Sequence, residues 1–125
     1  MDFALLFVFL FLIITFGYSA FEKIINFKES VIYYRNYLSK TFLKKYITPI
    51  LFFVIVAEVI STILFLIGIF EVFSLKSIYY GFYGLVIASS TLLCFLFGQR
   101  LAKDYEGARG IAIYFIICLI GFLIC

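Results

Sequence analysis

Long stretches without a charged side chain are the feature that most limits how this chain can fold. Three of them, 3–21, 46–70 and 77–99, are long enough to cross the hydrocarbon core of a bilayer as helices, and only Glu58 interrupts them. A fourth stretch, 110–125, reaches a spanning length if its helix begins about one turn earlier. These stretches do not alternate between apolar and polar residues at every second position, which argues against the strands of a membrane barrel.

The amino-acid composition also indicates that lipid surrounds most of the chain. Hydrophobic residues make up 66% of the 125 residues and charged residues only 14%. A water-soluble core of this size could not bury so much apolar surface, so lipid is the expected surrounding of most side chains. We therefore predict an all-α membrane protein in which a single domain, 1–125, forms a bundle of four transmembrane helices. The predicted spans are 3–21, 46–70, 77–99 and 106–125.

Lys and Arg residues are unequally distributed between the predicted loops. Six lie within 23–45 and three within 100–109, whereas Lys76 is the only one between the second and third spans. Because basic residues favour the cytoplasmic side of a membrane, we predict cytoplasmic first and third loops and both termini outside. The formal net charge of +3 is then a membrane-surface feature, and nucleic acid is not an expected partner.

The segment between the first two spans, about 24–44, has the pattern of an amphipathic helix. Apolar residues recur at intervals of three and four, and polar residues take the opposite face. The apolar positions are Ile24, Phe27, Val31, Tyr34, Leu38 and Phe42, and the polar ones are Glu29, Arg35, Asn36 and Lys40. Asn26, three residues before Glu29, resembles an N-terminal helix cap. We predict a helix in the headgroup layer, with an extension of a neighbouring span as the alternative.

Glu58 lies in the middle of the second span, where the sequence offers no Lys or Arg within any span to pair with it. An ionised carboxylate in hydrocarbon is costly, which favours a group that is protonated and hydrogen-bonded. Hydroxyl side chains at a similar depth in the second and third spans predict a polar layer of Glu58, Thr62, Ser89, Ser90 and Thr91. Its two interpretations are a proton-handling or ligand-binding site and a hydrogen bond between helices that fixes their packing.

The use of histidine and cysteine narrows the chemistry. The chain has no histidine, which excludes His-based metal sites and His acid–base catalysis. Cys94, Cys118 and Cys125 form no Cys-x-x-Cys pair, so we expect small apolar side chains rather than a redox dithiol. We therefore predict no metal site and assign no catalytic residue.

Short motifs occur in the first two spans and in the third loop. The first span ends in Phe16-Gly17-Tyr18-Ser19-Ala20-Phe21-Glu22-Lys23, the second contains Pro49, Glu58 and Gly68, and the third loop begins Gly98-Gln99-Arg100. Together they resemble the signature of the DoxX/MauE-like family, with Ala20 where that family usually has glycine. The resemblance implies a four-helix bundle in the bacterial cytoplasmic membrane, often associated with redox or envelope complexes. Its signature positions here are Ser19, Lys23, Glu58, Gly68 and Arg100.

Three functions are compatible with these features. The first is a non-enzymatic accessory or assembly subunit of a membrane redox or envelope complex, because almost nothing projects into water. The second is a quinone-interacting oxidoreductase subunit with Glu58 as its proton-handling group. The third is a small transporter or channel subunit that works as an oligomer. The expected partners are bilayer lipids, other membrane proteins and further copies of the chain. The sequence indicates no cofactor, with a quinone as the alternative.

Overall fold

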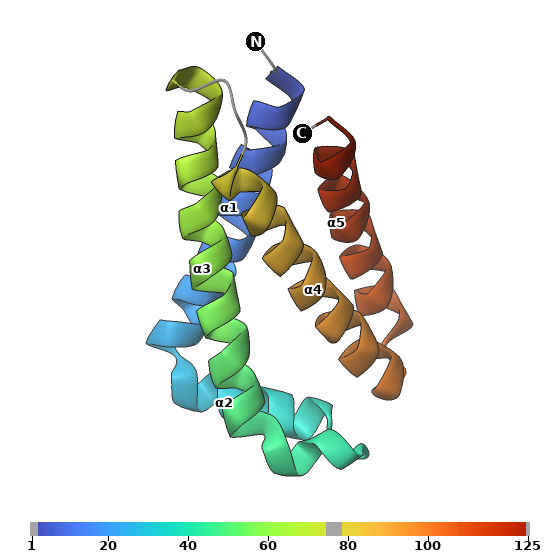
Figure 1. The fold of residues 1–125 in the computed structure, drawn as a ribbon. Helices are drawn as coiled ribbons and strands as arrows, with labels where there is room; N and C mark the ends of the chain where they lie inside the picture. The colour runs from blue at the N-terminus through green and yellow to red at the C-terminus, as the bar shows by residue number, and fades with distance from the viewer. Residues whose placement is uncertain (1–2, 75–78, 125) are drawn as a thin grey trace.

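The structure, a computed structural model, describes residues 3–74 and 79–124, and Lys76, Ser77 and Cys125 of the sequence analysis lie outside these ranges. Four long helices form a bundle, and a shorter helix lies across one of its ends (Figure 1). The elements are α1 (Phe3–Ile25), α2 (Phe27–Tyr37), the 3-10 helix η1 (Phe42–Tyr46), α3 (Ile47–Ser74), α4 (Tyr80–Leu101) and α5 (Tyr105–Ile124). The long helices are apolar enough to cross a membrane, which confirms the predicted all-α bundle with four spans.

The spanning helices extend beyond the charge-free stretches that predict them. α1 continues past Glu22 and Lys23 to Ile25, and α3 continues past Glu71 to Ser74. Charged residues limit the apolar part of a span, but Glu and Lys are good helix formers and do not end the backbone hydrogen bonding. Lys23 and Glu71 therefore belong to helices, and both of their side chains are buried.

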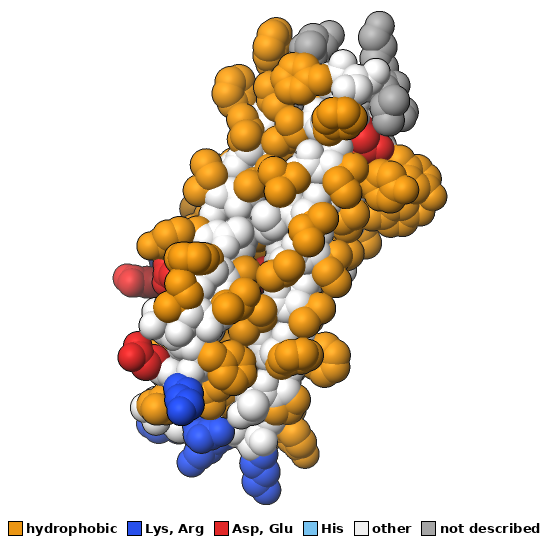
Figure 2. Space-filling view, turned by 90° about the vertical axis from the view of Figure 1, so that its left-hand side faces the viewer, with side chains coloured by type: hydrophobic (Ala, Val, Ile, Leu, Met, Phe, Trp, Pro, Cys, Tyr) orange, Lys and Arg blue, Asp and Glu red, His pale blue; other side chains and the backbone are white. Residues whose placement is uncertain are grey.

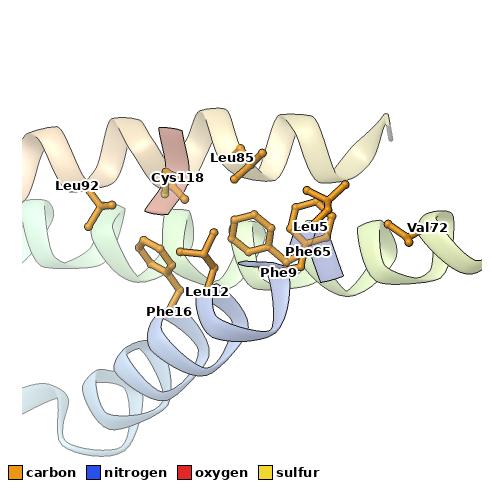
Figure 3. Close-up of a cluster of buried hydrophobic side chains, with 10 residues drawn as sticks. Leu5, Phe9, Leu12, Phe16, Phe65, Val72, Leu85, Leu92 and Cys118 are labelled. Atoms are coloured by element: carbon orange, nitrogen blue, oxygen red, sulfur yellow. The ribbon is translucent and has the colours of Figure 1, made fainter. Parts of the chain in front are cut away.

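The apolar core lies between α1, α3 and α4, with a smaller contribution from α5 (Figure 3). Its buried members are Leu5, Phe9, Leu12 and Phe16 of α1, Phe65 and Val72 of α3, Leu85, Ala88 and Leu92 of α4, and Cys118 of α5. The rings of Phe9 and Phe65 pack with their centroids 5.5 Å apart. α5 contributes less because only Ala108, Cys118 and Gly121 are buried there, and its other residues are half-buried or exposed.

α3 and α4 approach each other closely at glycines. A Cβ atom on Gly68 would lie 2.8 Å from the Cα of Gly81 and 3.0 Å from Cε2 of Phe9. A Cβ atom on Gly84 would lie 3.1 Å from the Phe65 ring. Only glycine fits at Gly68 unless a backbone moves, so this residue sets how near the two helices can come.

Glu71 holds the first turn of α4 from within the bundle. Its side chain is 3% exposed. Oε2 accepts the backbone N–H of Tyr79 at 3.1 Å, and Oε1 accepts those of Tyr80 at 3.0 Å and Gly81 at 3.2 Å. The first N–H groups of a helix have no partner within it, so a carboxylate from α3 supplies the cap of α4.

α2 shows the amphipathic pattern predicted from Phe27 onward, but the first position of the predicted apolar stripe, Ile24, belongs to α1 and is exposed. Phe27, Val31 and Tyr34 are half-buried and Leu38 is buried, whereas the predicted polar face is exposed. The chain turns after Leu38 and forms η1 instead of continuing one helix to residue 44, so Phe42 leaves the apolar stripe and is exposed.

The predicted cap at Asn26 is only partly correct. Asn26 is the N-cap residue of α2, but its side chain makes no capping hydrogen bond. Its backbone N–H still bonds to the carbonyl of Glu22 at 3.0 Å, because α1 runs directly into α2 and Asn26 is the single residue between them.

Basic side chains gather at one end of the molecule. Figure 2 shows Lys and Arg side chains at the lower end and hydrophobic side chains over most of the remaining face. The same end holds α2 and the turn between α4 and α5, while α1 begins and α5 ends at the opposite end (Figure 1). The two loops with most of the basic residues therefore share one end of the bundle.

Candidate functional site

An ion pair joins α1 and α3 inside the bundle. Nζ of Lys23 lies 3.1 Å from Oε1 of Glu58, and these residues are 7% and 1% exposed. The Lys23 ammonium also donates a hydrogen bond to Oγ of Ser19, one turn earlier on α1. The prediction that Glu58 has no basic partner within a span is wrong, because α1 continues through Lys23 and brings its ammonium to Glu58.

The spacing of buried positions explains this pairing. The buried residues of α1 are Leu5, Phe9, Leu12, Phe16, Ala20 and Lys23. Those of the first two-thirds of α3 are Ile47, Leu51, Ile55, Glu58, Ser61, Phe65 and Gly68. Both series repeat at intervals of three or four, so Lys23 and Glu58 occupy positions on the buried stripes of their helices. Extending the apolar stripe of the first span by one turn would have identified Lys23 from the sequence.

One oxygen of the Glu58 carboxylate has no partner. Oε2 is buried and accepts no hydrogen bond from any residue that the structure describes. Three further buried polar atoms have no hydrogen-bond partner among the described residues, namely Oε1 of Gln99 and the hydroxyl oxygens of Ser61 and Ser89. Buried polar atoms are nearly always bonded, and an unbonded one costs about 1–3 kcal/mol. A carboxylate oxygen in this position is available to a hydrogen-bond donor from outside the chain.

Three of the other four residues of the predicted polar layer bond elsewhere. The hydroxyls of Thr62, Ser90 and Thr91 each donate to the backbone carbonyl four residues earlier in their own helix. Ser90 is exposed, and Ser89 is buried. Short hydroxyl side chains in a helix reach such carbonyls easily and so need no carboxylate. The Glu58 carboxylate instead pairs with Lys23 of α1.

A cavity of about 440 Å³ lies beside the ion pair, at the end of the bundle that α2 covers. Ser19, Lys23, Glu58 and Gln99 contribute polar groups to its wall. Most of the remaining wall is apolar or aromatic and includes Phe16, Leu51, Val54, Leu92, Phe95, Ile111 and Tyr114. Its size falls in the range of small-molecule sites, about 300–1,000 Å³, and a mainly apolar wall with a few polar groups is typical of them.

α2 contributes three tyrosines to this wall, Tyr33, Tyr34 and Tyr37. The Tyr37 hydroxyl donates a hydrogen bond to Asp104, whose Oδ1 also accepts the backbone N–H of Gly107 at 3.0 Å. Both hydrogen bonds lower the pKa of Asp104, and the one from Tyr37 has the larger effect. Burial and the neighbouring Asp104 raise the pKa of Tyr37. The bond ties α2 to the turn before α5 and so holds it over the cavity.

The turn between α4 and α5 positions both Gln99 and Asp104. The N–H of Asp104 bonds to the carbonyl of Gln99 at 2.9 Å, and that of Lys103 bonds to the carbonyl of Arg100 at 3.2 Å. Lys103 has a φ of 61°, the left-handed conformation that ends a helix in this pattern. The Arg100 guanidinium lies 5.0 Å from the centroid of the Tyr105 ring.

A second, more open hollow of about 600 Å³ lies between α1 and α2. It shares Ser19, Lys23, Tyr33 and Tyr34 with the cavity. Its other lining residues are mostly polar and include Glu22, Asn26, Glu29 and Ser30. Lys23 therefore lies between a polar hollow and a mainly apolar cavity.

The five positions that carry the resemblance to the DoxX/MauE-like signature lie in three different places. Ser19, Lys23 and Glu58 meet at the cavity, whereas Gly68 belongs to the α3–α4 contact and Arg100 to the end of α4. Their grouping at the cavity could not be read from their positions in the sequence.

The cysteines lie in different surroundings. Cys118 is buried in the core, and Cys94 is exposed and lines part of the cavity. Across residues 3–74 and 79–124, no group of three or more Cys, Asp or Glu side chains is arranged to hold a metal ion.

The fold and the cavity define the class of this protein. Four apolar helices with a largely hydrophobic outer surface make it an integral, multi-pass, α-helical membrane protein whose surroundings are bilayer lipids. Comparisons with models of known protein families, with curated proteins and with solved structures find no match to this chain.

Proposed function

We propose that this protein is an accessory subunit of a membrane redox complex and that its own contribution is a binding cavity for a quinone-type molecule. The observation that carries the proposal is the Lys23–Glu58 pair in the wall of an otherwise mainly apolar cavity inside the bundle. Charged side chains within membrane helices are rare and commonly mark a ligand or ion site.

The chemistry of the wall supports this ligand class. A quinone has a flat, apolar ring with oxygen atoms at its edge and partitions into lipid. Aromatic side chains such as Phe16, Phe95 and Tyr114 offer apolar surface to such a ring. Lys23, Glu58 and Gln99 provide hydrogen-bonding groups to its oxygen atoms.

A purely structural role explains the ion pair less well. Replacing a buried ion pair by apolar residues of similar volume is often neutral or stabilising, so packing alone does not require one. This pair also leaves Oε2 of Glu58 without a partner among the described residues, which is a cost to the fold. A ligand that bonds to this oxygen would remove the cost.

The cellular setting is part of the proposal. The gathering of basic residues at the α2 end favours that end facing the cytoplasm, with both termini on the other side. The resemblance to the DoxX/MauE-like family supports a bacterial inner membrane and an association with redox proteins. The cavity would then lie near the cytoplasmic face, behind α2.

The test is purification from native membranes in a mild detergent, followed by mass spectrometry of the bound lipids and proteins. Under anaerobic, reducing conditions the wild-type protein is expected to retain a quinone-type molecule in stoichiometric amount, and Glu58→Gln is expected to lose most of it. Glu106→Gln is the matched control, because Glu106 is exposed at the start of α5. Absence of any quinone-type molecule from the wild-type protein, in native membranes that contain it, would contradict the proposal.

A second candidate is an assembly subunit that acts through protein contacts alone. The outward face of α5 favours it, because Ile113, Ile116, Leu119, Ile120 and Leu123 are all exposed there. In the same experiment this function predicts a stoichiometric protein partner that remains bound to Glu58→Gln.

A further inference from the structure

The cavity presents hydrogen-bond acceptors that have no donor. We propose that it binds the reduced, dihydroxy form of a quinone-type ligand more tightly than the oxidised, dicarbonyl form. This inference rests on the proposed function, since it concerns the redox state of the ligand that the same cavity would hold.

The first observation is the free oxygen of Glu58. The residue is 1% exposed and lines the cavity, and its Oε2 accepts no hydrogen bond within residues 3–74 and 79–124. A hydroxyl group of a reduced ligand can donate to this oxygen. The ion pair with Lys23 holds Glu58 in its carboxylate form, so a carbonyl oxygen of the oxidised ligand would place one acceptor against another.

The second observation is that the nearest donor already makes two hydrogen bonds. The Lys23 ammonium bonds to Oε1 of Glu58 at 3.1 Å and to Oγ of Ser19. It also lies 5.7 Å from the centroid of the Phe95 ring, which attracts a cation. An ammonium has three N–H donors, so these two hydrogen bonds leave one for a ligand. A hydroxyl oxygen and a carbonyl oxygen can both accept it, so Lys23 does not favour the oxidised form.

Gln99 adds a second acceptor to the same wall. Its Oε1 is buried without a partner among the described residues, and its position is fixed by the end of α4. The amide of Gln99 also carries an NH₂ group, so this residue can bond to a hydroxyl or to a carbonyl group of the ligand. The preference for the reduced form therefore rests on Oε2 of Glu58.

The charge of the site argues against a cationic donor. Lys23 lies beside Glu58 and compensates its negative charge, so an added ammonium would meet a positive neighbour in a low-dielectric surrounding. The unfilled acceptors are therefore suited to a neutral molecule with hydroxyl groups.

The test compares the two redox forms of one probe on the wild-type protein in lipid nanodiscs. The probe is a short-chain naphthoquinone, used as such and after anaerobic reduction to the naphthoquinol. The reduced form is expected to bind at least ten-fold more tightly, which corresponds to a rise of about 30 mV in the midpoint potential of the bound two-electron couple.

The outcomes separate the two proposals. Equal affinity, or tighter binding of the oxidised form, overturns this inference and leaves the proposed function standing. Failure of both forms to bind overturns both. The ratio of the two affinities on the wild-type protein tests this inference even if a variant does not fold.

Variants locate the source of the preference. Glu58→Gln retains the shape of the side chain but replaces one acceptor oxygen by an NH₂ donor, so the preference is expected to fall below two-fold. Gln99→Met removes a group that can bond to either form, so it is expected to weaken both forms about equally and to leave the ratio nearly unchanged. Glu106→Gln should leave both affinities unchanged. A ratio that survives Glu58→Gln would overturn the assignment to this carboxylate oxygen.

Discussion

Two buried glutamates on the same helix have opposite surroundings. Glu71 is 3% exposed, and its two carboxylate oxygens accept three backbone N–H groups at the start of α4. Glu58 is 1% exposed, yet one of its oxygens bonds to Lys23 and the other has no partner in the described part of the chain. Both oxygens of the Glu71 carboxylate are therefore hydrogen-bonded within the fold, whereas Oε2 of Glu58 lacks a partner among the described residues and its side chain lines a cavity.

This difference distinguishes a structural acid from a candidate site acid. Around Glu71 the helices are in close contact, with glycine against glycine at Gly68 and Gly81. Around Glu58 the helices diverge enough to leave about 440 Å³, and α2 covers the gap. Burial alone would rank the two residues equally, so the discriminating property is whether the polar atoms are satisfied.

The largest effect is expected from separating the ion pair. Lys23→Met should lower the free energy of unfolding by about 3–5 kcal/mol, because it leaves the Glu58 carboxylate buried without a counter-charge. The double variant with Glu58→Met should recover most of this loss. Reversible unfolding in mixed micelles, followed by circular dichroism, measures both. A double variant as unstable as Lys23→Met alone would show that the cost does not come from the unpaired charge.

Glu71→Ala should destabilise the protein by about 2–3 kcal/mol, because three N–H groups lose their acceptor. The same unfolding measurement applies. Unlike the change at Lys23, this loss should not be recovered by a second substitution at Glu58. The redox preference of the cavity should also stay unchanged, and a shift in that preference would mean that the two acids are not independent.

Gly68→Ala tests the close contact near Glu71. The new methyl group would meet the backbone of Gly81 at 2.8 Å, so we expect a loss of about 2 kcal/mol. Gly110→Ala is the control, because no atom lies within 4 Å of its added Cβ and alanine favours a helix by about 1 kcal/mol. Equal stability of the two variants would show that α3 and α4 are not in contact here.

The smallest effect is expected at the tie between α2 and the α4–α5 turn. Since the pKa of Asp104 is lowered on folding, its stabilisation is complete above the ordinary aspartate value of about 4 and is lost as the pH falls through the lower, folded-state pKa. Tyr37→Phe should remove part of this dependence, because the hydrogen bond from Tyr37 is its first cause. The measurement is the pH dependence of unfolding for the two proteins. Identical profiles between pH 2 and 5 would contradict the role of this bond.

Several features could be predicted from single residues and their spacing. The charge-free stretches predict four spanning helices, and the apolar stripe from Phe27 to Leu38 predicts the buried face of α2. These features depend on local periodicity and on the solvent, which a sequence displays directly. The prediction at Asn26 is only partly correct, because the capping hydrogen bond depends on how α1 leads into α2 and not on residue type alone.

The cavity is different, because its parts come together over long distances in the chain. Lys23 and Glu58 are separated by 35 residues, and Tyr37 and Asp104 by 67. The sequence predicts a partner layer of hydroxyls for Glu58 from depth alone, but depth does not specify which neighbouring helix a side chain faces. That depends on the rotation of each helix, which core packing such as that of Phe9 against Phe65 determines.

The sequence by itself determined that this chain is a helical membrane protein, that its basic residues fall in two loops, and that one acid lies within a span. The tertiary structure decided that Lys23 pairs with this acid, that Glu71 caps α4, and that α2 covers a cavity with unfilled acceptors. The reason is physical. Solvent and periodicity act on each segment separately, whereas the satisfaction of a buried polar atom depends on the register between segments.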